Sequence, residues 1–373
     1  MLAIGIMSGT SLDGVDCALV EIKDEKFNLI KFITLDYSQE FKNKLAKNLN
    51  NEEAKLSEIS SLNFELGDWF NKAIDKLLDG TNYSYKDISF VSSHGQTIWH
   101  DPKGVFGRPS TLQIGEASVI TNHTNITVVN NFRSADVACG GQGAPLVPMS
   151  EFIIYKGLNK NIVLQNIGGI GNLTYIKKGA NIDDVIAFDT GPGNCMIDYF
   201  TKRYFDKPFD DGGKIASSGR VIDDILDYLK KDPYLLIDPP KSTGRELYSQ
   251  SFMLDLEKKL DFDKYDKRDI IATITYYTSY SIYYHYKKYL QDIDLVVLSG
   301  GGSHNEYIRS TLSKLLNVDV LTQEDLGYNS DSKEAMAFVV LGYLTLKKKC
   351  GNVTSVTGAR ESVILGDVHY GGN

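Results

Sequence analysis

Clusters of glycine, hydroxyl and carboxylate side chains stand at the ends of apolar runs in this chain. The first cluster, "MSGTSLDGVD" at 7–16, offers the hydroxyl groups of Ser8, Thr10 and Ser11 and closely spaced amides at Gly9 and Gly14. Such a turn can wrap a phosphate, because glycine lets the backbone approach closely and N–H and O–H groups donate to the phosphate oxygens. An ordinary hairpin turn is the alternative interpretation. No G-x-x-x-x-G-K-[ST] sequence occurs, so the turn is not a Walker P-loop.

Two further glycine clusters have the same character. "NIGGIGNLTY" at 166–175 is a second strand–turn–strand pattern, and with the first hairpin it could clamp a triphosphate from two sides. "LSGGGSHN" at 298–305 ends one strand and opens a helix, which would let an adenine or ribose lie on the backbone beside a helix N-terminus. A tight strand-to-helix turn is the alternative for this third cluster.

Asp189 is the carboxylate best placed for catalysis. In "AFDTGPGN" at 187–194 it ends an apolar run and precedes a Gly-Pro-Gly turn and a helical pattern. A carboxylate in that position suits a general base, and capping of the following helix is the structural alternative. An aspartic protease needs two such carboxylates sharing a proton. The chain has a single D-T-G, which excludes that class.

The segments "SSHGQTIWH" at 92–100 and "NFRSADVACGGQGAPLVP" at 131–148 hold the remaining polar candidates. Arg133 is a bidentate donor that could receive a carboxylate or phosphate. Asp136 and Gln142 could bind hydroxyl or amide groups. His94 and His100 have no third metal ligand near them in the sequence, which favours hydrogen bonding over zinc.

The elements that must position these residues alternate along the chain. Apolar, β-branched runs are separated by helical patterns at 52–79, 194–205, 219–231 and 268–290, which predicts an α/β protein. The run "AMAFVVLGYLTL" at 335–346 is too short to span a bilayer and predicts a buried helix. Ligands of open α/β sheets bind beyond the carboxyl ends of the strands, where the polar clusters stand.

Length and composition set the class of protein. With 373 residues, 42% hydrophobic and 24% charged, the chain is globular and long enough for two domains. A net charge of −8 speaks against nucleic acid or an anionic membrane as the partner. Four cysteines without a C-x-x-C pair, and no signal-peptide pattern, predict a cytoplasmic protein.

The chain resembles the anhydro-N-acetylmuramic acid kinase family. The resemblance rests on nine blocks that follow one another in the family's order from residue 4 to about 367. They read "IGIMSGTSLDGVD", "SHGQTIWH", "QIGE", "NFRSADVACGGQGAPLVP", "NIGGIGNLT", "FDTGPGN", "PPKSTGRE", "SGGGSHN" and "SVTGA".

The resemblance implies a two-domain actin-like ATPase (ribonuclease H-like) α/β fold with an interdomain cleft. We expect domain I at 1–130 plus 352–373 and domain II at 131–351. The implied reaction uses ATP, Mg²⁺ and water to convert 1,6-anhydro-N-acetylmuramic acid into N-acetylmuramic acid 6-phosphate and ADP, in recycling of the bacterial cell wall. A homodimer is implied as well.

The resemblance also implies roles for individual residues. Asp189 is the base that activates water, and Glu334 in "DSKEAMAF" helps to hold the sugar and the water. Asp13 of the first turn could hold Mg²⁺ through water, which follows from the turn's own residues. The sugar-binding candidates are His94, Gln96, Arg133, Asp136 and Gln142. The ATP-binding candidates are Gly9, Thr10, Ser11, Leu12, Asp13, Gly14, Val15, Asp16, Asn166, Gly168, Gly169, Asn172, Gly300, Gly301, Gly302 and Asn305.

Two other functions remain open at this point. One is a nucleotide-gated binding module without catalysis, against which the presence of Asp189 and Glu334 speaks. The other is a kinase for a different small acid or sugar, which the fold alone would allow. The resemblance includes the presumed sugar-side blocks at 131–148 and 238–246, and this speaks against the second alternative.

Overall fold

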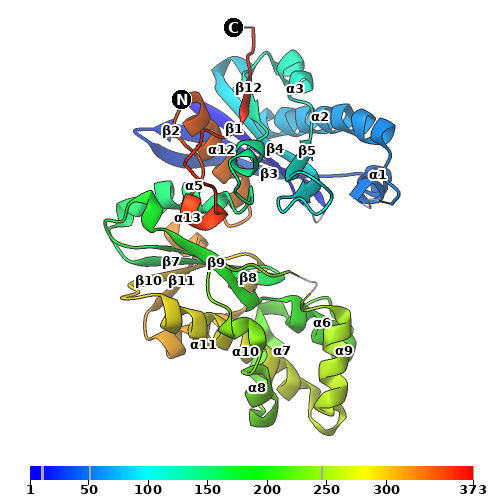
Figure 1. Ribbon diagram of the computed structural model, residues 1–373, viewed down its shortest axis with the longest axis vertical. Helices are drawn as coiled ribbons and strands as arrows, with labels where there is room; N and C mark the ends of the chain where they lie inside the picture. The colour runs from blue at the N-terminus through cyan, green and yellow to red at the C-terminus, as the bar shows by residue number, and fades with distance from the viewer. Residues whose placement is uncertain (10–11, 50–51, 245–246, 373) are drawn as a thin grey trace. The chain divides into compact units, whose positions relative to one another are not determined.

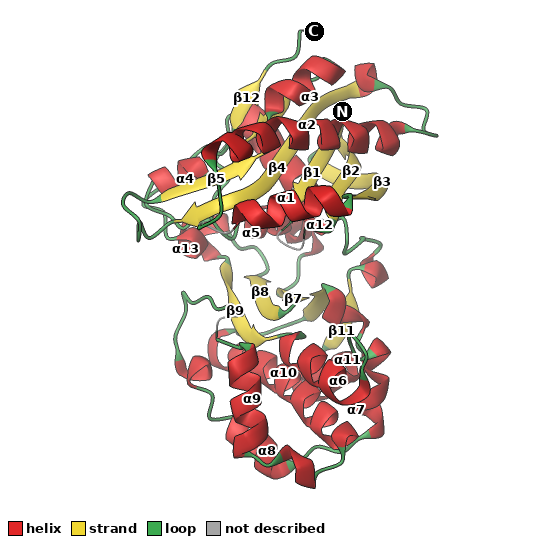
Figure 2. Ribbon diagram, turned by 90° about the vertical axis from the view of Figure 1, so that its right-hand side faces the viewer, coloured by secondary structure: helices red, strands yellow, loops and turns green. Residues whose placement is uncertain are grey.

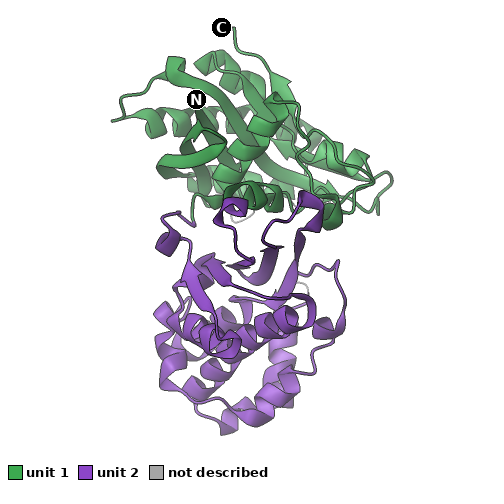
Figure 3. Cartoon of the chain, turned by 90° about the vertical axis from the view of Figure 1, so that its left-hand side faces the viewer, with its two compact units in different colours: residues 1–154, 331–373 green, residues 155–330 purple. Residues whose placement is uncertain are grey.

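The chain forms two compact units in the computed structural model, which describes residues 1–9, 12–49, 52–244 and 247–372 (Figure 1). The first unit comprises residues 1–154 and 331–373, and the second comprises residues 155–330 (Figure 3). The expected limits of domain I were residues 130 and 352. The first unit extends beyond both of them, to residue 154 and back to residue 331. Among the described residues, no helix is long and apolar enough to cross a membrane.

The first unit is built on one mixed sheet. Its strand order is β12-β6-β4-β1-β2-β3, with β5 paired to β4. The strands are β1 (Leu2–Ser8), β2 (Gly14–Lys23), β3 (Lys26–Asp36), β4 (Ile88–Asp101), β5 (Ser110–Ile114), β6 (Val128–Asn130) and β12 (Asp367–His369). The helices are α1 (Gln39–Leu49), α2 (Leu56–Leu78), α3 (Ala117–Thr124), α4 (Ser134–Ala138), α5 (Val147–Tyr155), α12 (Lys333–Leu346) and α13 (Thr354–Thr357).

Helices α2 and α12 cover opposite faces of this sheet. Alternate residues of a strand point to opposite faces, and Ile4 of β1 belongs to the same core cluster as Phe70 of α2. The next residue, Gly5, faces the other helix, since a β-carbon there would stand 2.0 Å from the Ala335 carbonyl oxygen. The hydroxyl of Ser92 in β4 also donates to the Phe338 carbonyl of α12. The buried helix predicted at 335–346 is thereby confirmed, and its packing explains why it belongs to the first unit.

The second unit repeats the plan with a five-stranded sheet in the order β11-β10-β7-β8-β9. The strands are β7 (Ile162–Ile167), β8 (Ile170–Ile176), β9 (Ile186–Pro192), β10 (Leu295–Ser299) and β11 (Asp319–Thr322). The helices are α6 (Cys195–Phe205), α7 (Lys214–Ser218), α8 (Asp223–Leu229), α9 (Gln250–Lys259), α10 (Lys267–Tyr289) and α11 (Glu306–Leu316) (Figure 2). The patterns that predicted helices at 194–205, 219–231 and 268–290 correspond to α6, α8 and α10.

Short 3₁₀ helices connect these elements. They are η1 (Tyr85–Asp87), η2 (Lys156–Leu158), η3 (Ile182–Asp184), η4 (Asp211–Gly213), η5 (Pro233–Leu236), η6 (Phe262–Lys264), η7 (Gly301–His304) and η8 (Glu324–Leu326).

The two sheets share one topology although the sequence has no internal repeat. In each, three successive strands form an antiparallel meander, β1-β2-β3 or β7-β8-β9. Two later strands then add in parallel beside the first one, as β4 and β6 or as β10 and β11. The first glycine hairpin joins β1 to β2, and the second occupies the equivalent position between β7 and β8. The predicted α/β fold of two domains is confirmed, and the expected cleft stays a prediction.

Candidate functional site

The first glycine hairpin is a tight turn between β1 and β2. Leu12 has a left-handed backbone (φ 58°), and its N–H donates to the Gly9 carbonyl at 3.2 Å. Gly14 opens β2 where a β-carbon would stand 2.4 Å from the Leu35 carbonyl oxygen, so packing alone requires glycine there. Val15 is fully buried, which leaves it a packing role. Two of the predicted ATP-binding residues, Thr10 and Ser11, lie outside the described residues.

A buried hydrogen-bond network supports the base of this turn. The Ser8 hydroxyl donates to Gln96 Oε1 at 2.6 Å and lies 2.7 Å from the Tyr37 hydroxyl. Gln96, a predicted sugar-binding residue, is 0% exposed. Its observed contact therefore ties the end of β1 to β4 beneath the turn.

Carboxylates gather beside the first hairpin. Desolvation raises the pKa of Asp16, and the charges of Asp331 and Asp13 raise it further. The Thr34 hydroxyl, which donates to Asp16 Oδ1 at 2.6 Å, lowers the pKa and so opposes these effects. A carboxylate whose pKa is raised by neighbouring like charges indicates a place where a cation would be favourable. In the described part of the chain, no three His, Cys, Asp or Glu side chains are close enough to enclose a metal. Mg²⁺ commonly binds through one or two carboxylates, water and substrate phosphates, and Asp13 and Asp16 fit that pattern.

Glu334 lies in the first turn of α12, in the same unit. Desolvation raises the pKa of its carboxyl group, the charges of Lys333 and Arg133 lower it, and Asp16 raises it. The neighbouring Lys333 is held by a 2.6 Å ion pair with Glu151 of α5, whose side chain is only 5% exposed. The start of α12 is thus anchored, and Glu334 has a weakened preference for the charged form.

Arg133 and His94 form the basic part of the predicted sugar site. Arg133 Nε donates to His94 Nε2 at 3.0 Å, and its Nη1 donates to the Gly143 carbonyl at 2.6 Å. His94 Nδ1 lies 2.8 Å from the Gly95 carbonyl, so the ring is neutral with its proton on Nδ1. Desolvation and the Arg133 charge lower the pKa of His94 to about 3. The guanidinium therefore has a fixed orientation, which suits recognition of a carboxylate.

The two other sugar-side candidates differ sharply in exposure. Asp136 is 0% exposed, and its carboxylate accepts hydrogen bonds from the Gly143 N–H, Asn352 Nδ2 and the Thr357 hydroxyl. It joins the 131–148 segment to α13. Gln142 is exposed, and its backbone N–H donates to the Thr357 carbonyl at 2.8 Å. The observed contacts make Asp136 a support for the loop that presents Gln142.

The second glycine hairpin is fixed from below by the start of α6. The N–H groups of Asn194 and Gly193 donate to the carbonyls of Gly168 and Gly169, at 2.7 and 2.9 Å. At Gly168 an added β-carbon would meet only ordinary contacts, the nearest at 3.6 Å. Protein packing therefore does not require glycine at 168.

The glycines of the third turn differ in how much space surrounds them. A β-carbon would stand 2.9 Å from the Ile167 carbonyl oxygen at Gly300 and 2.3 Å from the Ile167 side chain at Gly302. At Gly301 the nearest atom would be 3.7 Å away. Asn305 is buried and caps α11 by accepting from the Ile308 N–H at 3.2 Å. Gly301 is thus the position of this turn that is open to a ligand.

Two residues that lie next to these turns were not predicted from the sequence. Asn194 Nδ2 donates to the Ile167 carbonyl at 3.0 Å and lies beside Gly301. Gly213, at the end of η4, approaches Asn305 so closely that a β-carbon would stand 2.2 Å from its Oδ1. "DDGG" at 210–213 is a turn signal that could have drawn attention to η4. Nothing in the local sequence links Asn194 to the third glycine turn.

Asp189 lies in β9, beside Asn172 of β8. Its carboxylate Oδ2 accepts a hydrogen bond from the Thr243 N–H at 2.8 Å, and its own N–H donates to the Lys241 carbonyl at 3.3 Å. The Tyr234 hydroxyl donates to the Asp189 carbonyl oxygen at 2.9 Å. The carboxylate is therefore oriented by the 241–243 segment, and these contacts are not those of a helix cap.

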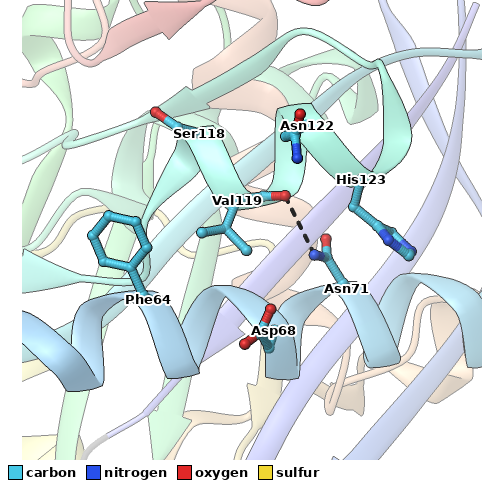
Figure 4. A pocket seen from close by; sticks show the side chains of 7 residues that line it. All are labelled: Phe64, Asp68, Asn71, Ser118, Val119, Asn122 and His123. Atoms are coloured by element: carbon cyan, nitrogen blue, oxygen red, sulfur yellow. Dashed lines mark hydrogen bonds between the residues drawn. The ribbon is translucent and has the colours of Figure 1, made fainter.

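An open pocket of about 720 Å³ lies apart from these residues, between α2 and α3 (Figure 4). It is lined by Phe64, Asp68, Asn71, Ser118, Val119, Asn122 and His123. None of the predicted site residues lines it.

Comparisons with known proteins identify the family to which the chain belongs. The family model for anhydro-N-acetylmuramic acid kinase matches residues 1–371. The chain is 46% identical to the anhydro-N-acetylmuramic acid kinase of Clostridioides difficile (strain 630), covering 99% of this chain and 98% of the relative. It is also 46% identical to that of Bacillus thuringiensis subsp. konkukian (strain 97-27), covering 99% of both chains.

A solved structure is similar at a lower level. The activator of the 2-hydroxyisocaproyl-CoA dehydratase from Clostridium difficile with bound ADPNP has a TM-score of 0.46 and 11% identity, over 93% of this chain and 96% of that one. The predicted family and the predicted enzyme class, a kinase, are confirmed by the sequence comparisons. The chain belongs to the anhydro-N-acetylmuramic acid kinase family.

Proposed function

We propose that the protein uses ATP and water to convert 1,6-anhydro-N-acetylmuramic acid into N-acetylmuramic acid 6-phosphate and ADP, as a step of cell-wall recycling. The observation that supports this most directly is the orientation of Asp189, whose carboxylate is held by the Thr243 N–H at 2.8 Å. The substrate is assigned from relatives that are named for this sugar and are 46% identical over 99% of the chain.

Asp189 is the base in this proposal. It takes a proton from a water molecule, whose oxygen forms a bond to the anomeric carbon of the sugar. The bond between that carbon and O6 breaks, and O6 attacks the γ-phosphorus of ATP, which releases ADP. Catalysis then consists largely of positioning the water and both substrates.

Glu334 and Arg133 serve the sugar in this proposal. Arg133 is half-buried with a fixed orientation, and it would bind the lactyl carboxylate of the sugar through charge-assisted hydrogen bonds. Glu334 has a raised pKa, which suits a group that exchanges a hydrogen bond with the sugar or the water. His94 would orient Arg133, and Gln142 would face a hydroxyl or amide group of the sugar.

The backbone of the glycine turns would hold ATP. Gly9, Gly168 and Gly301 are the turn positions that we assign to close contact with the nucleotide. Asp13 and Asp16 would hold Mg²⁺ through water, and the ion would neutralise phosphate charge. A cytoplasmic location and a homodimer also belong to this proposal. The location is inferred from the cysteine pattern, and the homodimer from the family resemblance.

A coupled assay for ADP release tests the function. Purified protein, ATP and Mg²⁺ are mixed with the anhydro sugar, with N-acetylmuramic acid or with N-acetylglucosamine. We expect release of ADP with the anhydro sugar alone, together with a sugar 6-phosphate of the expected mass. Equal turnover of N-acetylglucosamine would contradict the assigned substrate, and binding of ATP without ADP release in the presence of any of the sugars would favour a nucleotide-gated binding module.

A further inference from the structure

The segment 238–243 is tied to Asp189 by its own backbone. The Lys241 carbonyl accepts from the Asp189 N–H at 3.3 Å, and the Thr243 N–H donates to Asp189 Oδ2 at 2.8 Å. At the other end of the segment, Asp238 receives hydrogen bonds from Lys288 and Tyr289 at 3.0 and 2.6 Å. Whatever fixes this segment therefore fixes the orientation of the Asp189 carboxylate.

The Lys241 side chain is partly buried beneath the segment. Its Nζ donates to the Tyr234 carbonyl at 2.9 Å, lies 2.6 Å from His285 Nε2 and stands 4.4 Å above the Tyr234 ring. His285 is 0% exposed, and its Nδ1 lies 2.6 Å from the Ser281 carbonyl of α10. The ring is consequently neutral, with its Nε2 free of a proton and able to accept from Lys241.

Tyr234, the second anchor of Lys241, is itself fixed. Its N–H donates to Asp232 Oδ1 at 2.9 Å, and its hydroxyl donates to the Asp189 carbonyl at 2.9 Å. Asp232 Oδ2 accepts from the hydroxyls of Tyr248 and Tyr277, both at 2.8 Å. The bonds form a closed circuit from Asp189 through Tyr234 and Lys241 back to Asp189.

The charges around Lys241 come from several elements. Desolvation and the neighbouring Lys288 lower the pKa of Lys241 to about 8, whereas Asp232, Asp238 and Asp189 oppose this. Desolvation and the Lys241 charge lower the pKa of His285 to about 4. At neutral pH the ammonium keeps its charge and three N–H donors, and the histidine keeps its acceptor.

We propose that Lys241 is a positioning residue for Asp189, because its ammonium group clamps the 238–243 segment to η5 and α10 and thereby holds the Thr243 N–H on the Asp189 carboxylate. This inference rests on the proposed function, in which Asp189 is the base. Lys241 does not touch the reacting atoms. It acts on the rate through the direction of a carboxylate that must meet a water molecule.

A double-mutant cycle tests the proposal. The variants are Lys241→Met, which keeps the length of the side chain without its donors, Asp189→Asn, and the two combined. Lys287→Met is the matched control, because Lys287 is an exposed lysine of α10 whose Nζ lies over the Tyr283 ring. The kcat, the KM for both substrates and the melting temperature are measured for each, at pH 7.

We expect Lys241→Met to lower kcat by roughly 10- to 100-fold, because small misplacements of a catalytic group have effects of that order. The KM for ATP should change by less than about threefold, and Lys287→Met should behave as the unmodified protein. In the Asp189→Asn background, Lys241→Met should reduce kcat no further than about twofold, because the group that it positions no longer works as a base.

Two results would overturn the proposal. One is a kcat of Lys241→Met within about twofold of the unmodified protein, and the other is an equal loss in both backgrounds. If Asp189→Asn alone keeps its kcat, the proposed base is wrong, and this result is distinct from a failure of Lys241. If Lys241→Met does not fold, Lys241→Gln, which keeps a donor for the Tyr234 carbonyl, goes through the same cycle.

Discussion

The two units hold matching arrangements of a basic side chain and a buried neutral histidine. In the first unit, Arg133 Nε donates to His94 Nε2 at 3.0 Å, and His94 Nδ1 lies 2.8 Å from a backbone carbonyl. In the second, Lys241 Nζ lies 2.6 Å from His285 Nε2, and His285 Nδ1 lies 2.6 Å from a backbone carbonyl. In both, the carbonyl fixes the tautomer and leaves one ring nitrogen to orient a cation.

The difference lies in the cation. Desolvation lowers the pKa of Arg133 to about 10 and that of Lys241 to about 8, so only the arginine keeps its full charge over the working pH range of most enzymes. Arginine is a planar donor suited to carboxylates, whereas lysine is a compact charge with three rotatable donors on a flexible stem. We infer that the first unit uses this arrangement for binding and the second uses it to position the base.

Replacing the base gives the largest expected effect. Asp189→Asn keeps the shape of the side chain and removes the proton acceptor, so kcat should fall by ~10²–10⁴ while the KM for the sugar changes little. Steady-state kinetics and the melting temperature are measured on the same sample. A stable variant with nearly normal kcat would show that Asp189 of the second unit is not the base.

Replacing the cation of the first unit should affect binding instead. Arg133→Met loses charge-assisted hydrogen bonds worth about 1.5–3 kcal/mol, so the KM for the sugar should rise roughly 10- to 100-fold, with a smaller change in kcat. Arg108→Met, at an exposed arginine of the same unit, is the control. If Arg133→Met lowers kcat and leaves KM unchanged, the division between binding and positioning is wrong.

The second glycine hairpin offers a test of ATP binding in which protein packing is not disturbed. Gly168→Val should fold, because the nearest atom to an added β-carbon is 3.6 Å away, yet the side chain would occupy space that we assign to the phosphates. ATP affinity measured by calorimetry should fall at least about tenfold, or about 1.4 kcal/mol. Gly157→Val, where a β-carbon meets nothing within 4 Å, is the matched control. Unchanged affinity at position 168 would contradict the assignment.

The two histidines predict a pH dependence of stability. Their folded pKa values are lowered to about 3 for His94 and about 4 for His285, below the ordinary value of 6.5. The unfolded chain therefore binds protons first as the pH falls, and the stability present above about pH 6.5 is lost toward the folded pKa values. The loss is about 1.4 kcal/mol per pH unit for each histidine.

Urea unfolding between pH 7 and 5 measures this effect. His94→Gln should make the free energy of unfolding of the first unit less dependent on pH, and His285→Gln should do the same for the second unit. A slope that neither substitution changes would show that the histidines are not buried in the neutral form.

The sequence identified the turns better than the side chains that surround them. The glycine hairpins and the strand that bears Asp189 are local patterns, and all three occur where they were predicted. Gln96 was predicted to bind the sugar from the family resemblance, and Asp136 from the resemblance and its residue type. The fold buries both, because they satisfy polar groups of distant segments, Ser8 for Gln96 and Thr357 for Asp136.

The sequence by itself determined the strands, the glycine turns, the buried helix at 335–346 and the family, because these depend on residue order over short distances and on ordered blocks. Only the tertiary structure decided that both sheets share one topology and that Lys241 and His285 meet beneath Asp189. Such contacts join residues 44 to 54 positions apart, as in Lys241 with His285 and Asp189 with Thr243. No local pattern encodes these pairs, because they exist only once packing has brought η5, α10 and β9 together.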